Sequence, residues 1–179
     1  MYILNFIIQQ GGSFKMNKKD LDFIQKKAEE AEIQDDICCR STLYGLSCYY
    51  DFIPKEVISA SLNLAGGVGA SSGSCGAFCG AQLAIGLKFN PEKGENDPVK
   101  VQAAQIKMMK FRDKFIEEFG TTLCPEIHKQ LFGKSYDFKD DKQTQEFFEI
   151  SDHAEKCAGV VGKAARIAAE FIEEESNDN

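Results

Sequence analysis

A glycine- and serine-rich loop delivers a cysteine to the predicted start of an apolar helix. The stretch reads Gly66-Gly67-Val68-Gly69-Ala70-Ser71-Ser72-Gly73-Ser74-Cys75-Gly76-Ala77-Phe78-Cys79-Gly80. The unpaired N–H groups and the positive dipole end of a helix N-terminus favour the thiolate form of a cysteine. Because the thiolate is the form that attacks, becomes oxidised or binds metal, we predict that the chemistry of this chain begins at Cys75.

Three other cysteines stand in positions that could converge with Cys75. Cys124 directly precedes a proline at another predicted helix start, where it could act as the N-cap. Cys39 and Cys157 fall on the apolar faces of two further predicted helices. Facing helices of a bundle commonly build metal and cofactor sites from their side chains. Taken singly, Cys39 and Cys157 are equally explained as small core side chains.

The elements that must position these cysteines are all helical. Apolar residues recur at intervals of three and four, and no alternating strand pattern is present. Asp97 and Pro98 are typical of the start of the longest helix, and Gly120 is typical of its end. We predict a compact all-α bundle of about six to seven helices. The expected helices span about 17–33, 36–50, 54–62, 74–87, 98–119, 124–133 and a final segment through 157–171.

The chain divides into one domain with two terminal segments. Residues 1–16 are an N-terminal extension, or an artefact of the start site, because Met16 precedes the first helical pattern. Residues 17–172 form a single helical domain that contains all seven cysteines, and residues 173–179 form an acidic tail expected to fray.

Composition limits the classes of partner. The 179 residues carry a net charge of −7 and no long basic run, which argues against binding to nucleic acid or to an anionic membrane. Residues 1–15 have no basic segment before their apolar run, so they do not resemble a secretory signal. We therefore expect a cytoplasmic protein with reduced cysteines, whose redox partner is unknown.

The ordered cysteines resemble those of a known redox-active protein family. Its pattern is a cysteine, a Cys-Gly-Ala-x-x-Gly motif and two later cysteines, and the motif stands here as Cys75-Gly76-Ala77-Phe78-Cys79-Gly80. The resemblance covers about residues 30–170 and implies a redox role for four cysteines, which would be Cys39, Cys75, Cys124 and Cys157. Some relatives carry an iron–sulfur centre or fused cytochrome segments. Cys38 leaves the first position ambiguous by one residue, a turn of about 100° around the helix.

Two chemistries fit the same residues. In the first, the four cysteines bind an iron–sulfur cluster, most simply of the two-iron type, or another metal. In the second, Cys75 is a nucleophile that cycles through a disulfide with Cys79 or a cysteine from another helix. A third possibility is a binding protein whose cysteines are structural. We favour a metal or cluster slightly.

Other features concern cofactors and assembly. The loop residues that would contact a bound cofactor are Gly67, Gly69, Gly73 and Gly76. The chain lacks Cys-x-x-Cys-His and a phosphate-loop pattern, so neither covalent haem nor a nucleotide is expected. His128 follows Cys124 by four residues, which allows either a Cys/His site or an exposed histidine. The stripe of Phe111, Phe115 and Phe119 fits a core or the seam of a homodimer.

Overall fold

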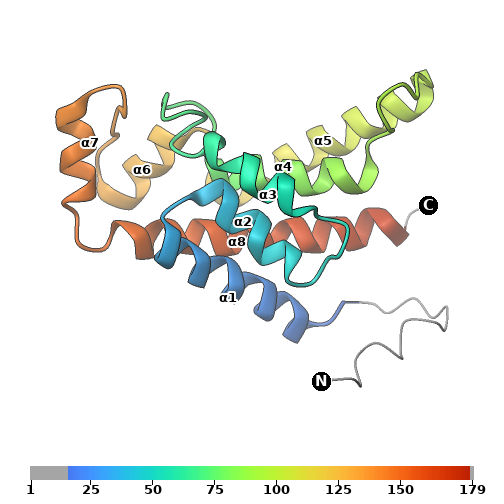
Figure 1. The fold of residues 1–179 in the computed structure, drawn as a ribbon, viewed down its shortest axis with the longest axis horizontal. Coiled ribbons are helices and arrows are strands. Elements are labelled where there is room, and N and C mark those ends of the chain that lie inside the picture. The colour runs from blue at the N-terminus through green and yellow to red at the C-terminus, as the bar shows by residue number, and fades with distance from the viewer. Residues whose placement is uncertain (1–15, 178–179) are drawn as a thin grey trace.

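The computed structural model describes residues 16–177, which form helices joined by turns (Figure 1). Eight α-helices and no strand occur in this part of the chain, so the all-α prediction is confirmed and the predicted number of helices is slightly low. Residues 1–15 of the predicted extension lie outside the described residues. The elements are α1 (Lys18–Asp35), α2 (Cys38–Ser47), α3 (Lys55–Ala60), the 3-10 helix η2 (Ser61–Leu64), α4 (Gly76–Phe89), α5 (Pro98–Phe119), α6 (Cys124–Phe132), α7 (Asp141–Phe148) and α8 (His153–Asn177).

Local capping signals fix several helix ends. The Asn17 side chain accepts hydrogen bonds from two backbone N–H groups at the start of α1, and the Asp20 carboxylate accepts one from the Asn17 backbone N–H group. At the start of α5, the Asp97 carboxylate accepts a hydrogen bond from the Val99 N–H group at 2.9 Å. Gly120 ends α5 with a φ of 74°, a conformation that glycine adopts without strain.

Helix α7 lies in a polar stretch after residue 133 for which the sequence pattern predicts no helix. It begins because the Asp140 carboxylate accepts hydrogen bonds from the backbone N–H groups of Lys142 and Gln143. Its apolar content is low, and among its residues only Phe147 is buried. The helix therefore depends on its N-cap and on one aromatic anchor, a combination that periodicity does not detect.

Helix α8, rather than α5, is the longest element, with 25 residues against 22. The prediction of a frayed tail from residue 173 is wrong up to Asn177, because α8 continues to that residue. Glu175 is 7% exposed there, and its carboxylate pairs with Lys107 at 2.5 Å and Lys110 at 2.8 Å. Two ammonium groups from α5 thus compensate the charge that burial would otherwise penalise.

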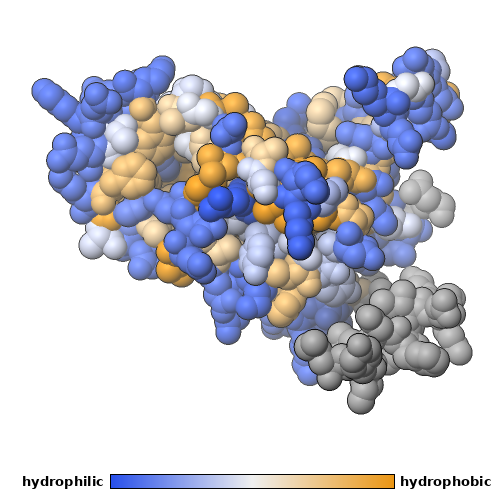
Figure 2. Space-filling view, viewed as in Figure 1, coloured by the Kyte–Doolittle hydropathy of each residue, from blue (hydrophilic) through white to orange (hydrophobic). Residues whose placement is uncertain are grey.

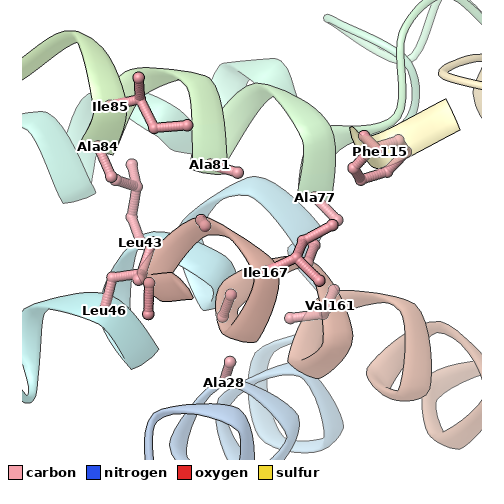
Figure 3. Packing of buried hydrophobic residues seen from close by; sticks show 14 of the residues in the cluster. Ala28, Leu43, Leu46, Ala77, Ala81, Ala84, Ile85, Phe115, Val161 and Ile167 are labelled. Carbon is pink, nitrogen blue, oxygen red and sulfur yellow. The ribbon is translucent and has the colours of Figure 1, made fainter. Parts of the chain in front are cut away.

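The core forms where α8 packs against α1, α2 and α4 (Figure 3). Small residues bring these helices close: a Cβ on Gly45 of α2 would lie 2.5 Å from the Ala28 Cβ of α1. Phe111 and Phe115 of α5 are fully buried and contact further aromatic rings of the core. The phenylalanine stripe therefore serves the core of this chain, and the homodimer stays a prediction.

No helix within residues 16–177 is both long and apolar enough to cross a membrane. Helices α6 and α7 lie together at one end of the molecule, and the start of α5 projects at the other (Figure 1). The glycine-rich loop runs beside α6, so the cysteines it carries belong to the α6–α7 end.

Candidate functional site

Three cysteines from three helices line one cavity of about 380 Å³ at the α6–α7 end of the molecule. We call it the cysteine cavity. Hydrophobic residues gather on this part of the face shown in Figure 2. The lining consists of Glu32, Asp36, Cys38, Leu62, Asn63, Ala65, Gly66, Gly69, Ala70, Cys124, His128, Phe138, Thr144, Phe147, Phe148 and Cys157. Cys38, Cys124 and Cys157 thus share one cavity.

A short antiparallel bridge places Cys75 beside Cys124. It pairs Ser74 with Leu123. The Cys75 N–H group donates to the Thr122 carbonyl at 2.7 Å, and the Cys124 N–H group donates to Gly73 at 2.9 Å. Since the two cysteines directly follow the bridged residues, the starts of α4 and α6 meet there. Leu123 is the N-cap of α6, which corrects the expectation that Cys124 caps this helix.

Cys38, rather than Cys39, points to the cavity. A Cβ added to Gly76 would lie 2.2 Å from the Cys38 Sγ, so this sulfur rests directly on the glycine that follows Cys75. The Gly66 backbone lies close enough to the Cys38 sulfur to act on the pKa of this thiol, in the direction that lowers it. The Gly76 of the motif therefore leaves the space that the Cys38 sulfur fills.

Cys39 faces the α2–α4 interface. It is completely buried, and it is not among the residues that line the cavity. Its backbone carbonyl oxygen would lie 2.5 Å from a Cβ on Gly80, the last glycine of the motif. Burial raises the pKa of Cys39 to about 12. The geometry gives Cys39 a packing position and gives Cys38 the place at the cavity.

Cys79 lies on a different surface. It is half-buried and borders an apolar groove of about 670 Å³ between α4 and α5. Its sulfur is 4.0 Å from the Ser74 carbonyl oxygen. Cys75 is not among the residues that line the groove or the cavity, and its pKa is raised by both Cys79 and the cavity carboxylate Glu32. The assignment of Cys75 and Cys79 as catalytic residues stays a prediction.

Helix N-termini converge on the cysteine cavity. Cys38 and Cys124 are the first residues of α2 and α6, and Cys75 is the N-cap of α4. Cys157 is the fifth residue of α8. The partial positive charge of each helix start favours an anionic group nearby. The protein thus directs several backbone dipoles toward the sulfurs.

Burial outweighs these dipoles while the cysteines are free thiols. It raises the pKa of Cys75 to about 11, although the backbone N–H groups of Ala77 and Phe78 act in the opposite direction. It also raises the pKa of Cys124 to about 12, and it raises the pKa values of Cys38 and Cys157 above the ordinary range. The expected thiolate at Cys75 is therefore not favoured in the free protein, because desolvation penalises the charged form.

The cavity cysteines also disfavour ionisation of one another. Charges on Cys75 and Cys124 would raise the pKa values of both Cys38 and Cys157. The Glu32 carboxylate acts on Cys38, Cys75 and Cys157 in the same sense. Such coupling requires that these groups lie close together. A bound cation would reverse the effect, because it stabilises every neighbouring thiolate.

The glycine loop is a left-handed turn at the edge of the cavity. Residues 66–70 all have positive φ, including the non-glycine residues Val68 and Ala70. Of the glycines predicted to contact a cofactor, only Gly69 lines the cavity. The others act on the backbone: the Gly73 N–H group donates to the Gly67 carbonyl at 2.8 Å, and Gly76 accommodates Cys38. Strained backbone of this kind is commonly found at functional sites.

Two buried polar atoms at the cavity have no partner. Glu32 is 1% exposed and its Oε2 makes no hydrogen bond; burial raises its pKa to about 7, while the nearby Ser41 side chain and Ile37 backbone act on the carboxyl in the opposite direction. His128 is 5% exposed and its Nδ1 makes no hydrogen bond. An unpaired buried polar atom costs about 1–3 kcal/mol, so a cavity that borders two of them is suited to a polar or charged occupant.

The donors fit a thiolate-bound cluster in chemistry, although they are not gathered around a single point. Within residues 16–177, no three side chains of His, Cys, Asp or Glu are placed to hold one metal ion. Soft thiolates are nevertheless the ligands that iron–sulfur clusters require. Cys38, Cys124 and Cys157 line one cavity, and Glu32 and His128, which each have an unpaired buried atom, line it too. These features match a group of several atoms.

The comparison with protein families agrees with the cysteine pattern. Residues 37–171 match the family described as "Putative redox-active protein (C_GCAxxG_C_C)". The chain belongs to this family. The family name writes its motif as GCAxxG, whereas Cys75 precedes Gly76 in this member. Neither the curated proteins nor the solved structures contain a match to this chain.

Sequence reasoning left Cys38 and His128 undecided and did not consider Glu32. The periodicity of α2 gives adjacent cysteines similar weight, so only the position of Gly76 on the neighbouring helix decides between them. Glu32 lies before residue 37, where the match to the family begins. The one available signal was a glutamate on the otherwise apolar face of α1 that contains Ile24 and Ala28.

Proposed function

We propose that this redox-active family member transfers electrons through an iron–sulfur cluster held in the cysteine cavity. The observation that carries the proposal is the arrangement of Cys38, Cys124 and Cys157 around one cavity, with Cys75 fixed beside Cys124 by the backbone bridge. These four thiolates would hold the cluster. When bound, a two-iron cluster accepts and releases a single electron.

The chain contributes the environment of such a cluster. Cys38, Cys75 and Cys124 stand at the starts of α2, α4 and α6, and the backbone N–H groups of Ala77 and Phe78 favour the charged form of Cys75. Hydrogen bonds to cluster sulfurs raise the reduction potential, because they stabilise the more negative reduced state. Phe138, Phe147 and Phe148 line the same cavity and give it an apolar wall.

The test is iron and labile-sulfide analysis, with absorption spectra, on the full chain purified and reconstituted without oxygen. The wild-type protein should be brown and contain iron and sulfide in similar amounts. The cysteine-to-serine variants of positions 38, 75, 124 and 157 should each lose most of the iron. Cys39→Ser is the matched control, because Cys39 is adjacent to Cys38 in sequence and does not line the cavity. A colourless, iron-free wild-type protein would contradict the proposal.

Thiol–disulfide exchange is the second candidate, and the position of Cys79 favours it. Cys79 is half-buried at an open groove and lies one turn after Cys75 on α4. Two thiols would transfer two electrons and two protons to an external disulfide, which becomes two thiols while one S–S bond forms in the protein. Mass spectrometry of the iron-free protein after treatment with oxidised glutathione distinguishes this reaction. A Cys75–Cys79 disulfide would support it.

A further inference from the structure

His128 places a polar side-chain atom against a cavity sulfur. It lies on α6 one turn after Cys124, and its Nε2 is 3.6 Å from the Cys124 Sγ. The same imidazole lines the cysteine cavity and is 5% exposed. The expectation of an exposed or capping histidine is therefore wrong, because the turn that presents Cys124 to the cavity also carries His128 there.

An aromatic cage fixes the orientation of this imidazole. The Phe147 ring stacks on it with centroids 4.8 Å apart, and Phe132, Tyr136 and Phe138 contact it edge-on at 5.5–6.1 Å. These aromatic side chains come from α6, α7 and the connection between them. A ring packed on several sides cannot turn freely, so the contact with Cys124 is a fixed feature of the site.

The protonation state of the imidazole determines what this contact can do. The ring is 5% exposed and stacks on Phe147, and in such surroundings the uncharged form costs less to desolvate. A neutral imidazole carries one N–H donor and one lone pair. A thiolate sulfur only accepts, so the tautomer with its proton on Nε2 matches it. In that tautomer the unpartnered Nδ1 is a lone pair rather than an unused donor.

We propose that the Nε2–H group of His128 donates a hydrogen bond to the Cys124 sulfur of the redox centre and so raises its reduction potential. The inference rests on the proposed function. His128 acts through Cys124 and is therefore a positioning residue rather than a ligand. Donation to a ligand sulfur withdraws electron density and stabilises the reduced centre. The cysteine pattern that defines the family contains no histidine.

Redox titration of the reconstituted full chain tests this role. His128→Phe removes the donor and preserves a ring within the cage, so it should retain the iron and lower the reduction potential. The expected change is about tenfold in the reduction equilibrium, or ~59 mV for one electron. His128→Gln retains an N–H donor and should recover part of the difference. His153→Gln is the control, because His153 pairs with Asp36 at 3.1 Å and does not line the cavity.

Two results would overturn the inference. An unchanged potential in His128→Phe would show that the hydrogen bond has no influence, and loss of iron in both variants would make His128 a ligand. Nitrogen NMR of the iron-free chain provides a readout independent of the cluster. A neutral ring with its proton on Nε2 from pH 5 to pH 8 supports the contact, and a proton on Nδ1 contradicts it. If the wild type binds no iron, the proposed function and the effect on potential fail together, while the NMR result still decides the contact.

Discussion

Glu32 and His128 border the same cavity, and their buried side chains respond to pH in opposite directions. The pKa of Glu32 is raised to about 7, so the folded protein holds a proton that the unfolded chain releases near pH 4.5. The pKa of His128 is lowered to about 4, so the folded protein lacks a proton that the unfolded chain binds near pH 6.5. Burial is the first cause of both shifts, because it disfavours the charged form of either group.

The two residues should therefore compensate for one another in the stability of the iron-free protein. As the pH falls from 7 to 4.5, protonation of Glu32 increases the free energy of unfolding. As the pH falls from 6.5 to 4, the neutral buried His128 decreases this free energy. Each effect is of the order of 3 kcal/mol, at about 1.4 kcal/mol for each pKa unit. Relative to wild type, Glu32→Gln should lose stability on acidification and His128→Phe should gain it.

Urea unfolding between pH 4.5 and pH 8 measures both effects as differences from wild type. Glu56→Gln is the control, because Glu56 is exposed on α3. Parallel curves for Glu32→Gln and wild type would show that Glu32 is not buried as a proton-holding group. The result bears on function as well, since a carboxyl that holds a proton leaves less negative charge beside the thiolates.

At the scale of helices, the motif glycines serve the approach of α2 to α4. Gly76 accommodates the Cys38 sulfur and Gly80 accommodates the Cys39 carbonyl oxygen. Gly76→Ala would place a Cβ 2.2 Å from the Cys38 Sγ, a distance that forces the sulfur or the helices to move. We expect this variant to lose iron binding and about 1–3 kcal/mol of unfolding free energy.

The matched control for Gly76→Ala is Gly159→Ala. Gly159 lies within α8, and a Cβ there meets no atom within 4 Å. This change should retain iron and stabilise the chain by up to about 1 kcal/mol, since alanine favours a helix more than glycine. Thermal unfolding and iron content measure both variants. Full iron binding by Gly76→Ala would show that the Cys38 sulfur has room to move and that its position against Gly76 is not required.

Much of the helical layout could be predicted from local signals. The bounds of α5 follow from Asp97, Pro98 and Gly120, because an N-cap, a first-turn proline and a C-terminal glycine act within a few residues. The choice between Cys38 and Cys39 could not be predicted, because it depends on the surface of another helix. The pairing of Cys75 with Cys124 depends on the bridge between Ser74 and Leu123, which no periodicity encodes.

At the scale of the whole molecule, α6 and α7 form an outlying part of the fold. The helix pairs that pack most extensively are α1–α8, α1–α2 and α2–α4, and neither α6 nor α7 packs extensively on them. Residues 124–148 instead build a small aromatic cluster around Phe147, which contacts Phe132, Tyr136 and Phe138. This part joins the rest of the molecule through the bridge at Cys75, through the walls of the cysteine cavity, and through Ile127 of α6, which belongs to the main core.

A cluster bound to Cys38, Cys75, Cys124 and Cys157 would therefore connect the outlying part to α2, α4 and α8. In the iron-free protein, the amides of residues 120–150 should exchange hydrogen faster than those of the α8 core segment. Their exchange should slow markedly when the cluster is reconstituted. Residues 160–172 of α8, which lie in the core, should change little and serve as the internal reference. Because binding to the folded state alone stabilises it, slowing should increase with iron occupancy. Equal protection of residues 120–150 with and without iron would show that the aromatic cluster alone holds this part in place.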